Sequence, residues 1–96
     1  MKNEIDPHGF IVSPEAVASF HDDGIVILHT SKGTLFTANK AAARVWHGIE
    51  QRLPLEAIAE EISGVYQIGQ STAREHTLRF LAQLERHALI RREVAS

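Results

Sequence analysis

The stretch from Gly24 to Trp46 constrains the fold most, because it joins two strand-forming runs to a helix start without a linker. Ile25–Leu28 and Thr34–Ala38 have strand propensity, and a polar connection ending in Gly33 separates them. Asn39 follows as a preferred N-cap before an alanine-rich segment. A hairpin that leads directly into helices leaves its last strand as a free edge, and we expect the functional site there.

The chain has 96 residues, enough for one domain but not for a second core. We predict a single domain over residues 10–92, with flexible ends at 1–9 and 93–96. A net charge of −2 favours neither nucleic acid nor an anionic membrane as partner. Without cysteine there can be no disulfide, thiolate zinc site or cysteine nucleophile. No apolar run predicts a signal peptide or membrane span, so we expect a cytoplasmic protein.

Two further apolar runs precede the hairpin. Val17–Phe20 is predicted as the first strand, with a turn over His21–Gly24. Phe10–Val12 is predicted as a looser extended lead-in, and Leu89-Ile90 as a short extended piece at the other end of the domain.

Three later segments carry apolar residues at helical spacing. Helices are predicted over Lys40–Gln51, Pro54–Gly64 and Thr72–His87, the last opened by a capping box of Thr72 and Glu75. The expected buried positions are Ala42, Val45, Trp46, Ile49, Leu55, Ile58, Ala59, Ile62, Ala73, Thr77, Phe80, Leu81, Leu84 and Ala88. The predicted fold is α+β and winged-helix-like: a small antiparallel N-terminal sheet of three strands, followed by a three-helix bundle.

The third helix has an apolar surface that extends past its core stripe on one flank. Leu78 and Ala82 lie on this flank beside Arg74, whereas His76 and Gln83 lie on the other. Leu78 is either a single exposed leucine or part of a groove for a partner, and both interpretations stay open.

The strand Thr34–Ala38 is similarly open to two interpretations. Phe36 and Ala38 share one face and Leu35 and Thr37 the other, so Leu35 is exposed if the first pair faces the core. An unpaired edge can accept a peptide by strand addition. Alternatively, the N-terminal lead-in or a second copy of the chain covers the edge.

No residue pattern indicates catalysis or a metal. The six histidines lack the His-Glu-x-x-His spacing. His76 and His87 share a helix face but lie about 16 Å apart along the axis. The serines lack a nucleophile-elbow context, and the glycines lack phosphate-loop spacing. We therefore expect no catalytic residue, no metal and no cofactor.

The predicted fold also allows an alternative to peptide binding at the strand edge, namely the function of a winged-helix DNA-binding transcriptional regulator. The third helix would then be the recognition helix, and Lys32 a contact from the wing. Arginines late in the chain give some basic character, but glutamates interleave with them and the whole chain is acidic. A mixed-charge solvated surface is the preferred interpretation, and nucleic acid is not expected as a partner.

The order of strand, polar turn, Gly33, strand, Asn39, alanine-rich helix start and Trp46 resembles the PqqD-like family. Members are the peptide-recognition domains of ribosomally made and modified peptides (RiPP recognition elements). The resemblance covers roughly residues 17–90 and is closest to the stand-alone leader-binding members from lasso-peptide clusters. Where many relatives carry Asp-Val, this chain has His76-Thr77.

The resemblance implies a non-catalytic adaptor that binds the leader of a precursor peptide, and a lasso-peptide precursor is the one we expect. In relatives the leader lies along the third strand, in a cleft walled by the third helix, and is presented to a leader peptidase or other modifying enzyme. The implied peptide-binding residues lie in the hairpin connection, the last strand and the third helix: Lys32, Thr34, Leu35, Phe36, Thr37, Ala38, Arg74, Leu78 and Ala82.

Overall fold

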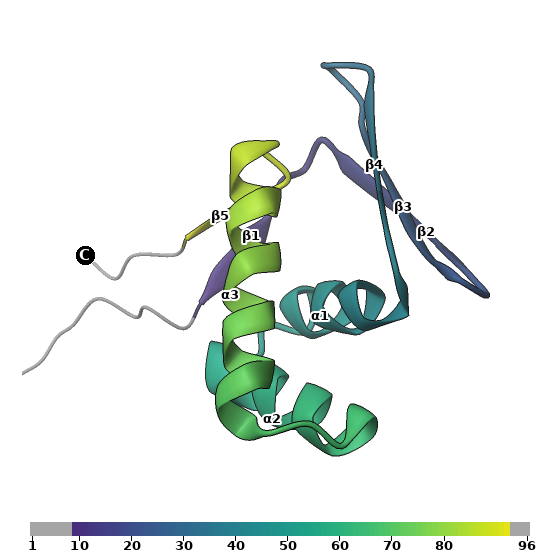
Figure 1. Ribbon diagram of the computed structural model, residues 1–96. Helices are drawn as coiled ribbons and strands as arrows, with labels where there is room; N and C mark the ends of the chain where they lie inside the picture. The colour runs from purple at the N-terminus through teal and green to yellow at the C-terminus, as the bar shows by residue number, and fades with distance from the viewer. Residues whose placement is uncertain (1–8, 93–96) are drawn as a thin grey trace, which may run out of the picture.

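Two small antiparallel sheets and three helices make up the fold (Figure 1). The computed structural model describes residues 9–92. The elements in chain order are β1 (Phe10–Val12), β2 (Ala16–His21), β3 (Gly24–His29), β4 (Thr34–Ala38), α1 (Lys40–Glu50), α2 (Leu55–Tyr66), α3 (Gln70–Arg86) and β5 (Ile90–Arg92). The predicted flexible ends lie outside the described residues apart from Gly9, which is buried.

Strands β2, β3 and β4 form a three-stranded antiparallel sheet in chain order, as the hairpin pattern predicts. Gly24 begins β3 with φ +154°, and a Cβ at this position would collide with the carbonyl oxygen of Ala38. Gly33 closes the β3–β4 connection with φ +69°, and its N–H donates to the His29 carbonyl. Both turns therefore depend on glycine.

The N-terminal lead-in corrects the predicted single sheet. Phe10–Val12 is a strand, β1, that pairs antiparallel with β5 in a separate two-stranded sheet, Val12 opposite Ile90. Phe10 and Ile90 are both buried. The two ends of the domain pair because each contributes an apolar residue to the core, a long-range contact that local patterns cannot indicate. The α+β class is confirmed, with two sheets in place of one.

The first helix begins where the sequence predicts. The Asn39 side-chain oxygen accepts a hydrogen bond from the Ala42 N–H at 3.0 Å. Helix α2 continues through Gly64, so the predicted stop there is wrong. Its end is set instead at Gln67, which has φ +55°, and by the Ser63 hydroxyl donating to the Ile68 carbonyl at 2.7 Å.

The start of α3 also differs from the prediction. The helix begins at Gln70 after Gly69, so Thr72 and Glu75 lie inside it and form no capping box. The predicted core stripe of α3 is buried at Ala73, Thr77, Phe80, Leu81 and Leu84, whereas Ala88 lies past the helix and is half-buried.

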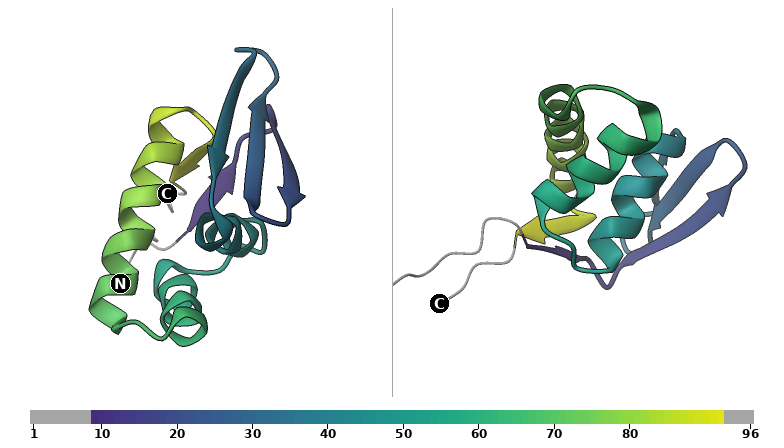
Figure 2. Two further views of the ribbon diagram at one scale, coloured as in Figure 1. Left: turned by 45° about the vertical axis from the view of Figure 1, so that its right-hand side comes forward. Right: turned by 90° about the horizontal axis from the view of Figure 1, so that it is seen from below.

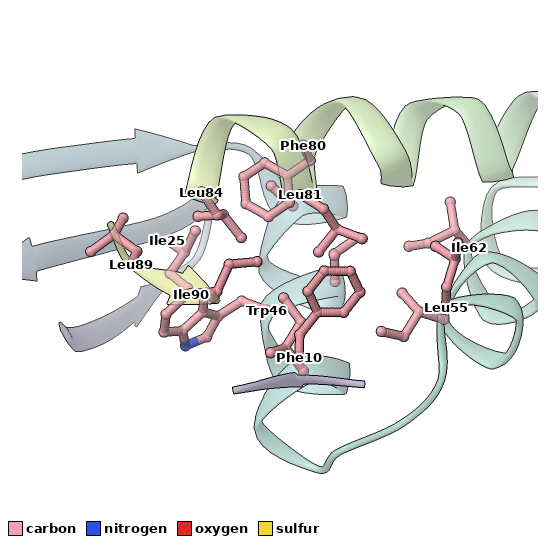
Figure 3. Close-up of a cluster of buried hydrophobic side chains, with 14 of the residues drawn as sticks. Phe10, Ile25, Trp46, Leu55, Ile62, Phe80, Leu81, Leu84, Leu89 and Ile90 are labelled. Atoms are coloured by element: carbon pink, nitrogen blue, oxygen red, sulfur yellow. The ribbon is translucent and has the colours of Figure 1, made fainter. Parts of the chain in front are cut away.

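The core lies where α1 meets the other elements. Helix α1 packs against both β3 and α2, and the views in Figure 2 show the three-stranded sheet projecting to one side of it while α2 and α3 lie on the other. Trp46 is fully buried at this junction, with Phe10, Ile25 and Leu84 around it (Figure 3). This confirms Trp46 as a core residue. The winged-helix likeness stays a prediction.

Candidate functional site

The candidate site begins at the free edge of β4. Within residues 9–92, β4 pairs with β3 alone. The Thr30 N–H donates to the Glu15 carbonyl at 2.9 Å, and hydrogen-bonded pairs alternate along an antiparallel ladder. With the observed registers, Phe36 therefore bonds to β3, whereas Leu35 and Thr37 direct their N–H and C=O groups to the free edge.

The side chains of β4 divide between two faces as predicted. Phe36 is half-buried and packs on Phe80 of α3 and on His87, the residue after the helix, with ring centroids 5.8 and 5.2 Å away. Leu35 points to the opposite face and is 68% exposed. The contacts of Phe36 fix which flank of α3 lies beside the β4 edge.

A cleft of about 930 Å³ lies between the end of β4, the start of α1, the end of α2 and one flank of α3. Its apolar residues come from all four elements and the segment after α2: Ala38, Ala41, Ala42, Val45, Ile62, Ile68 and Phe80. Most of these are buried or half-buried, so the cleft has an apolar floor. Thr37 lines the cleft as well, which places the unpaired backbone edge directly at its mouth.

The rim of the cleft carries charged and polar side chains. Lys40 stands at the start of α1, Asp23 at the β2–β3 turn, and His76 and Arg79 on α3. Arg79 pairs with Glu75 at 3.1 Å, and both side chains are mostly exposed. Exposed pairs of this kind contribute little free energy, so Arg79 can exchange its partner for a ligand carboxylate.

Arg74, Leu78 and Ala82, the site residues expected on α3, do not line this cleft. Arg74 turns to α2 and pairs with Glu56 at 2.8 Å, and Leu78 is 37% exposed. Positions two residues apart on a helix differ by about 200° in direction, so Leu78 cannot share a side with His76. The three expected residues thus lie on the flank of α3 that does not line this cleft, and their role in peptide binding stays a prediction.

The remaining expected residues lie along the hairpin. Lys32 is exposed in the β3–β4 connection, where its backbone N–H donates to His29 Nδ1 at 3.2 Å, and it does not line the cleft. Thr34 and Leu35 are exposed on β4, and neither lines the cleft. Of the expected residues, only Thr37 and Ala38 lie at the cleft itself.

Comparison with known proteins places this fold in a family. The family described as "Coenzyme PQQ synthesis protein D (PqqD)" matches residues 24–90, well over half of the chain. The chain belongs to the PqqD family. The resemblance to PqqD-like proteins is thereby confirmed. A comparison with curated proteins gave no match.

Two solved structures are similar to this PqqD-family protein. TbiB1 in complex with the TbiA(beta) leader peptide is 28% identical, with a TM-score of 0.78 over 83% of this chain and 93% of that one. A lasso peptide synthetase B1 complexed with the leader peptide is 18% identical, with a TM-score of 0.78 over 85% of this chain and 96% of that one. The second likeness supports the fold alone.

The residues that sequence reasoning missed share one property: they reach the cleft only through tertiary packing. Lys40, Tyr66 and Asp23 come from three different segments that meet at the cleft. The helical spacing does place His76 and Gln83 together, on the α3 flank opposite Leu78. The sequence favours the Leu78 flank as the groove wall because that flank is apolar.

Among residues 9–92, no three histidine, aspartate or glutamate side chains lie close enough together to hold a metal ion. None of the helices there has the length and apolarity that crossing a membrane requires.

Proposed function

We propose that this protein is a non-catalytic adaptor that binds the leader segment of a ribosomally made precursor peptide. The observation that carries the proposal is the unpaired edge of β4 at the mouth of an apolar cleft. Membership of the PqqD family and the likeness to TbiB1, whose structure holds a leader peptide, support it.

The leader adds to the sheet as a further strand beside β4. The N–H and C=O groups of Leu35 and Thr37 that point outward supply the main-chain hydrogen bonds. Alternate side chains of an extended peptide point to opposite faces, so one set enters the cleft and the other lies beside Leu35. Main-chain bonds then give affinity, and the cleft gives selectivity.

The α3 wall for this peptide is the flank that carries His76, Phe80 and Gln83. Apolar leader side chains contact the apolar floor of the cleft, of which Phe80 is a part. Charges at the rim, Lys40 and Arg79 above all, tune the on-rate and register more than the affinity.

The bound precursor is presented to a leader peptidase or other maturation enzyme, and a lasso-peptide pathway is the most direct assignment. The likeness to TbiB1, whose structure holds a leader peptide, and the sequence resemblance to the stand-alone members from lasso-peptide clusters support this choice. We place the adaptor in the cytoplasm, where the ribosome releases the precursor.

A DNA-binding role has less support. Two arginines of α3 are paired with glutamates, Arg74 with Glu56 and Arg79 with Glu75. A groove reader presents a clustered basic face instead.

The deciding experiment is a calorimetric titration with the synthetic leader of the precursor encoded beside this chain. A labelled duplex DNA pool is titrated in parallel at moderate salt. We expect leader binding with a dissociation constant of about 1 μM or below and no DNA binding. Salt-sensitive DNA binding without leader binding would overturn the proposal in favour of a transcriptional regulator.

A further inference from the structure

The outer edge of β2 lacks the features that normally keep a strand edge from pairing. Within residues 9–92, β2 pairs with β3 alone, and Figure 2 shows it at the margin of the sheet. From Ala16 to Phe20 the strand carries no charge and no proline. Native edges are usually protected by lysine, proline, a bulge or a covering element. This edge is therefore open to another strand.

Two large apolar side chains of β2 are exposed, and they lie on opposite faces of the sheet. Val17, opposite Leu28, is 55% exposed, and Phe20, opposite Ile25, is 51% exposed. Residues an odd number of positions apart on a strand point to opposite faces. A partner lying flat on either face covers only one of the two, whereas a strand added at the edge lies beside both.

The hydrogen-bond pattern of the sheet determines which groups of β2 point outward. The Thr30 N–H bonds to the Glu15 carbonyl. Because hydrogen-bonded pairs alternate along the ladder, Val17, Ser19 and His21 bond to β3. Ala16, Ala18 and Phe20 therefore direct their N–H and C=O groups to the free edge.

A second copy of the chain satisfies these outward groups in one symmetric register. When two β2 strands run antiparallel about Ala18, each Ala16 faces Phe20 of the second copy, and every outward group gains a partner. An axis at Ser19 instead sets Ala16 against Asp22, which lies in the turn. The register about Ala18 also places each phenylalanine beside a small alanine.

Charge complementarity selects the same register. Pairing about Ala18 places Glu15 opposite His21 of the second copy, and symmetry forms this contact twice. The hydrogen bond from the Thr30 hydroxyl, 2.9 Å long, lowers the pKa of the Glu15 carboxyl, so this group is anionic at neutral pH. The exposed His21 ring has its Nε2 atom 2.9 Å from the Ser19 hydroxyl oxygen, so Nδ1 is the ring atom left to donate to this carboxylate.

We propose that two copies of this protein associate through their β2 edges, Ala18 against Ala18, so that their three-stranded sheets join into one. The two β4 edges then lie at the opposite ends of the joined sheet, each free to pair with a peptide. Self-association uses the edge opposite to β4 and does not depend on the proposed leader binding.

A cysteine at the symmetry axis tests this register directly, because the chain has no cysteine of its own. In a hydrogen-bonded antiparallel pair the Cα atoms lie about 5.5 Å apart, which a disulfide can span. Under mild oxidation, Ala18→Cys is expected to give a disulfide-linked dimer on a non-reducing gel. The matched variant Thr37→Cys, on the other edge, is expected to stay monomeric. Equal cross-linking of both variants, or none at Ala18→Cys, overturns the proposal.

Sedimentation velocity of the natural sequence and of Ala18→Pro provides a second test. Proline removes an outward N–H and leaves the β3 ladder intact, which circular dichroism checks. We expect a concentration-dependent dimer whose dissociation constant rises at least about tenfold in Ala18→Pro. A natural protein that stays monomeric up to about 1 mM, or an Ala18→Pro dimer of unchanged stability, contradicts the proposal.

The same variants separate this proposal from the proposed function. Ala18→Pro is expected to bind the leader normally while its dimer weakens, and Thr37→Pro to keep the dimer while its leader binding weakens about tenfold. If Ala18→Pro loses both properties although it is folded, a separate dimer edge is excluded.

Discussion

The two flanks of α3 have similar exposure but different surroundings. One flank, with His76 and Gln83, lines the cleft beside β4. The other, with Leu78 and Ala82, lies on the side where Arg74 pairs with Glu56 of α2. The apolar flank is thus outside the cleft, and the polar one forms its wall. A helix surface indicates a binding site only together with the element that packs beside it.

The largest expected effect comes from a substitution in the core against which α3 packs. Trp46→Ala is expected to cost about 3–5 kcal/mol of unfolding free energy, because it leaves a large cavity where α1 meets the sheet and α3. Its Nε1 atom is buried without a hydrogen-bond partner among the described residues, so Trp46→Phe forfeits no bond and should cost clearly less. Urea denaturation measures both. Equal losses for the two variants would contradict this assignment of Trp46.

Neighbouring substitutions on α3 test the two flanks against each other. Gln83→Trp places a large ring in the cleft and is expected to weaken leader binding about thirtyfold or more, because it displaces peptide side chains from the apolar floor. Ala82→Trp makes the same change one residue away and is expected to leave binding unchanged. Calorimetric titration of both variants measures the difference, and a stronger effect of Ala82→Trp would show that the flanks are exchanged.

The edge of β4 has its own test. Thr37→Pro removes an N–H that points to the free edge and is expected to weaken leader binding about tenfold, with the fold retained. Leader binding is followed by fluorescence anisotropy of a labelled peptide. A folded Thr37→Pro protein with natural affinity rules out strand addition at this position.

The smallest expected effect concerns Arg74 and Arg79 of α3. Arg79→Ala is expected to slow association of an acidic leader about threefold at low salt, because Arg79 stands at the cleft rim. Arg74→Ala, which breaks only the exposed pair with Glu56, should leave the on-rate unchanged. Stopped-flow association at two salt concentrations compares them. An equal slowing by both variants would mean that the net charge of the protein, and not the position of Arg79 at the cleft, determines the association rate.

Local signals in the sequence were sufficient for the hairpin and the first helix. Asn39 caps α1, and the run from Gly24 to Ala38 forms β3 and β4 with Leu35 exposed as predicted. These features depend on residues a few positions apart, so propensity and spacing reveal them. The free edge of β4 follows from the same reasoning.

Features set by distant contacts were not predictable. The pairing of β1 with β5 joins the two ends of the domain, and no local pattern near Phe10 indicates this pairing. The end of α2 is a local feature, but residue types did not indicate it either, because Gln67 and not Gly64 takes the left-handed conformation that ends the helix. The cleft flank of α3 depends on Phe36 packing against Phe80, a contact between strand and helix that neither segment shows by itself.

Peptide binding at the β4 edge and the cleft flank of α3 can be followed residue by residue in an amide NMR titration with the synthetic leader. We expect the largest shifts at Leu35 and Thr37 on the strand and at His76 and Gln83 on the helix, with Leu78 unchanged. Shifts concentrated around Leu78, with β4 unaffected, would contradict this account and place the peptide on the other side of α3.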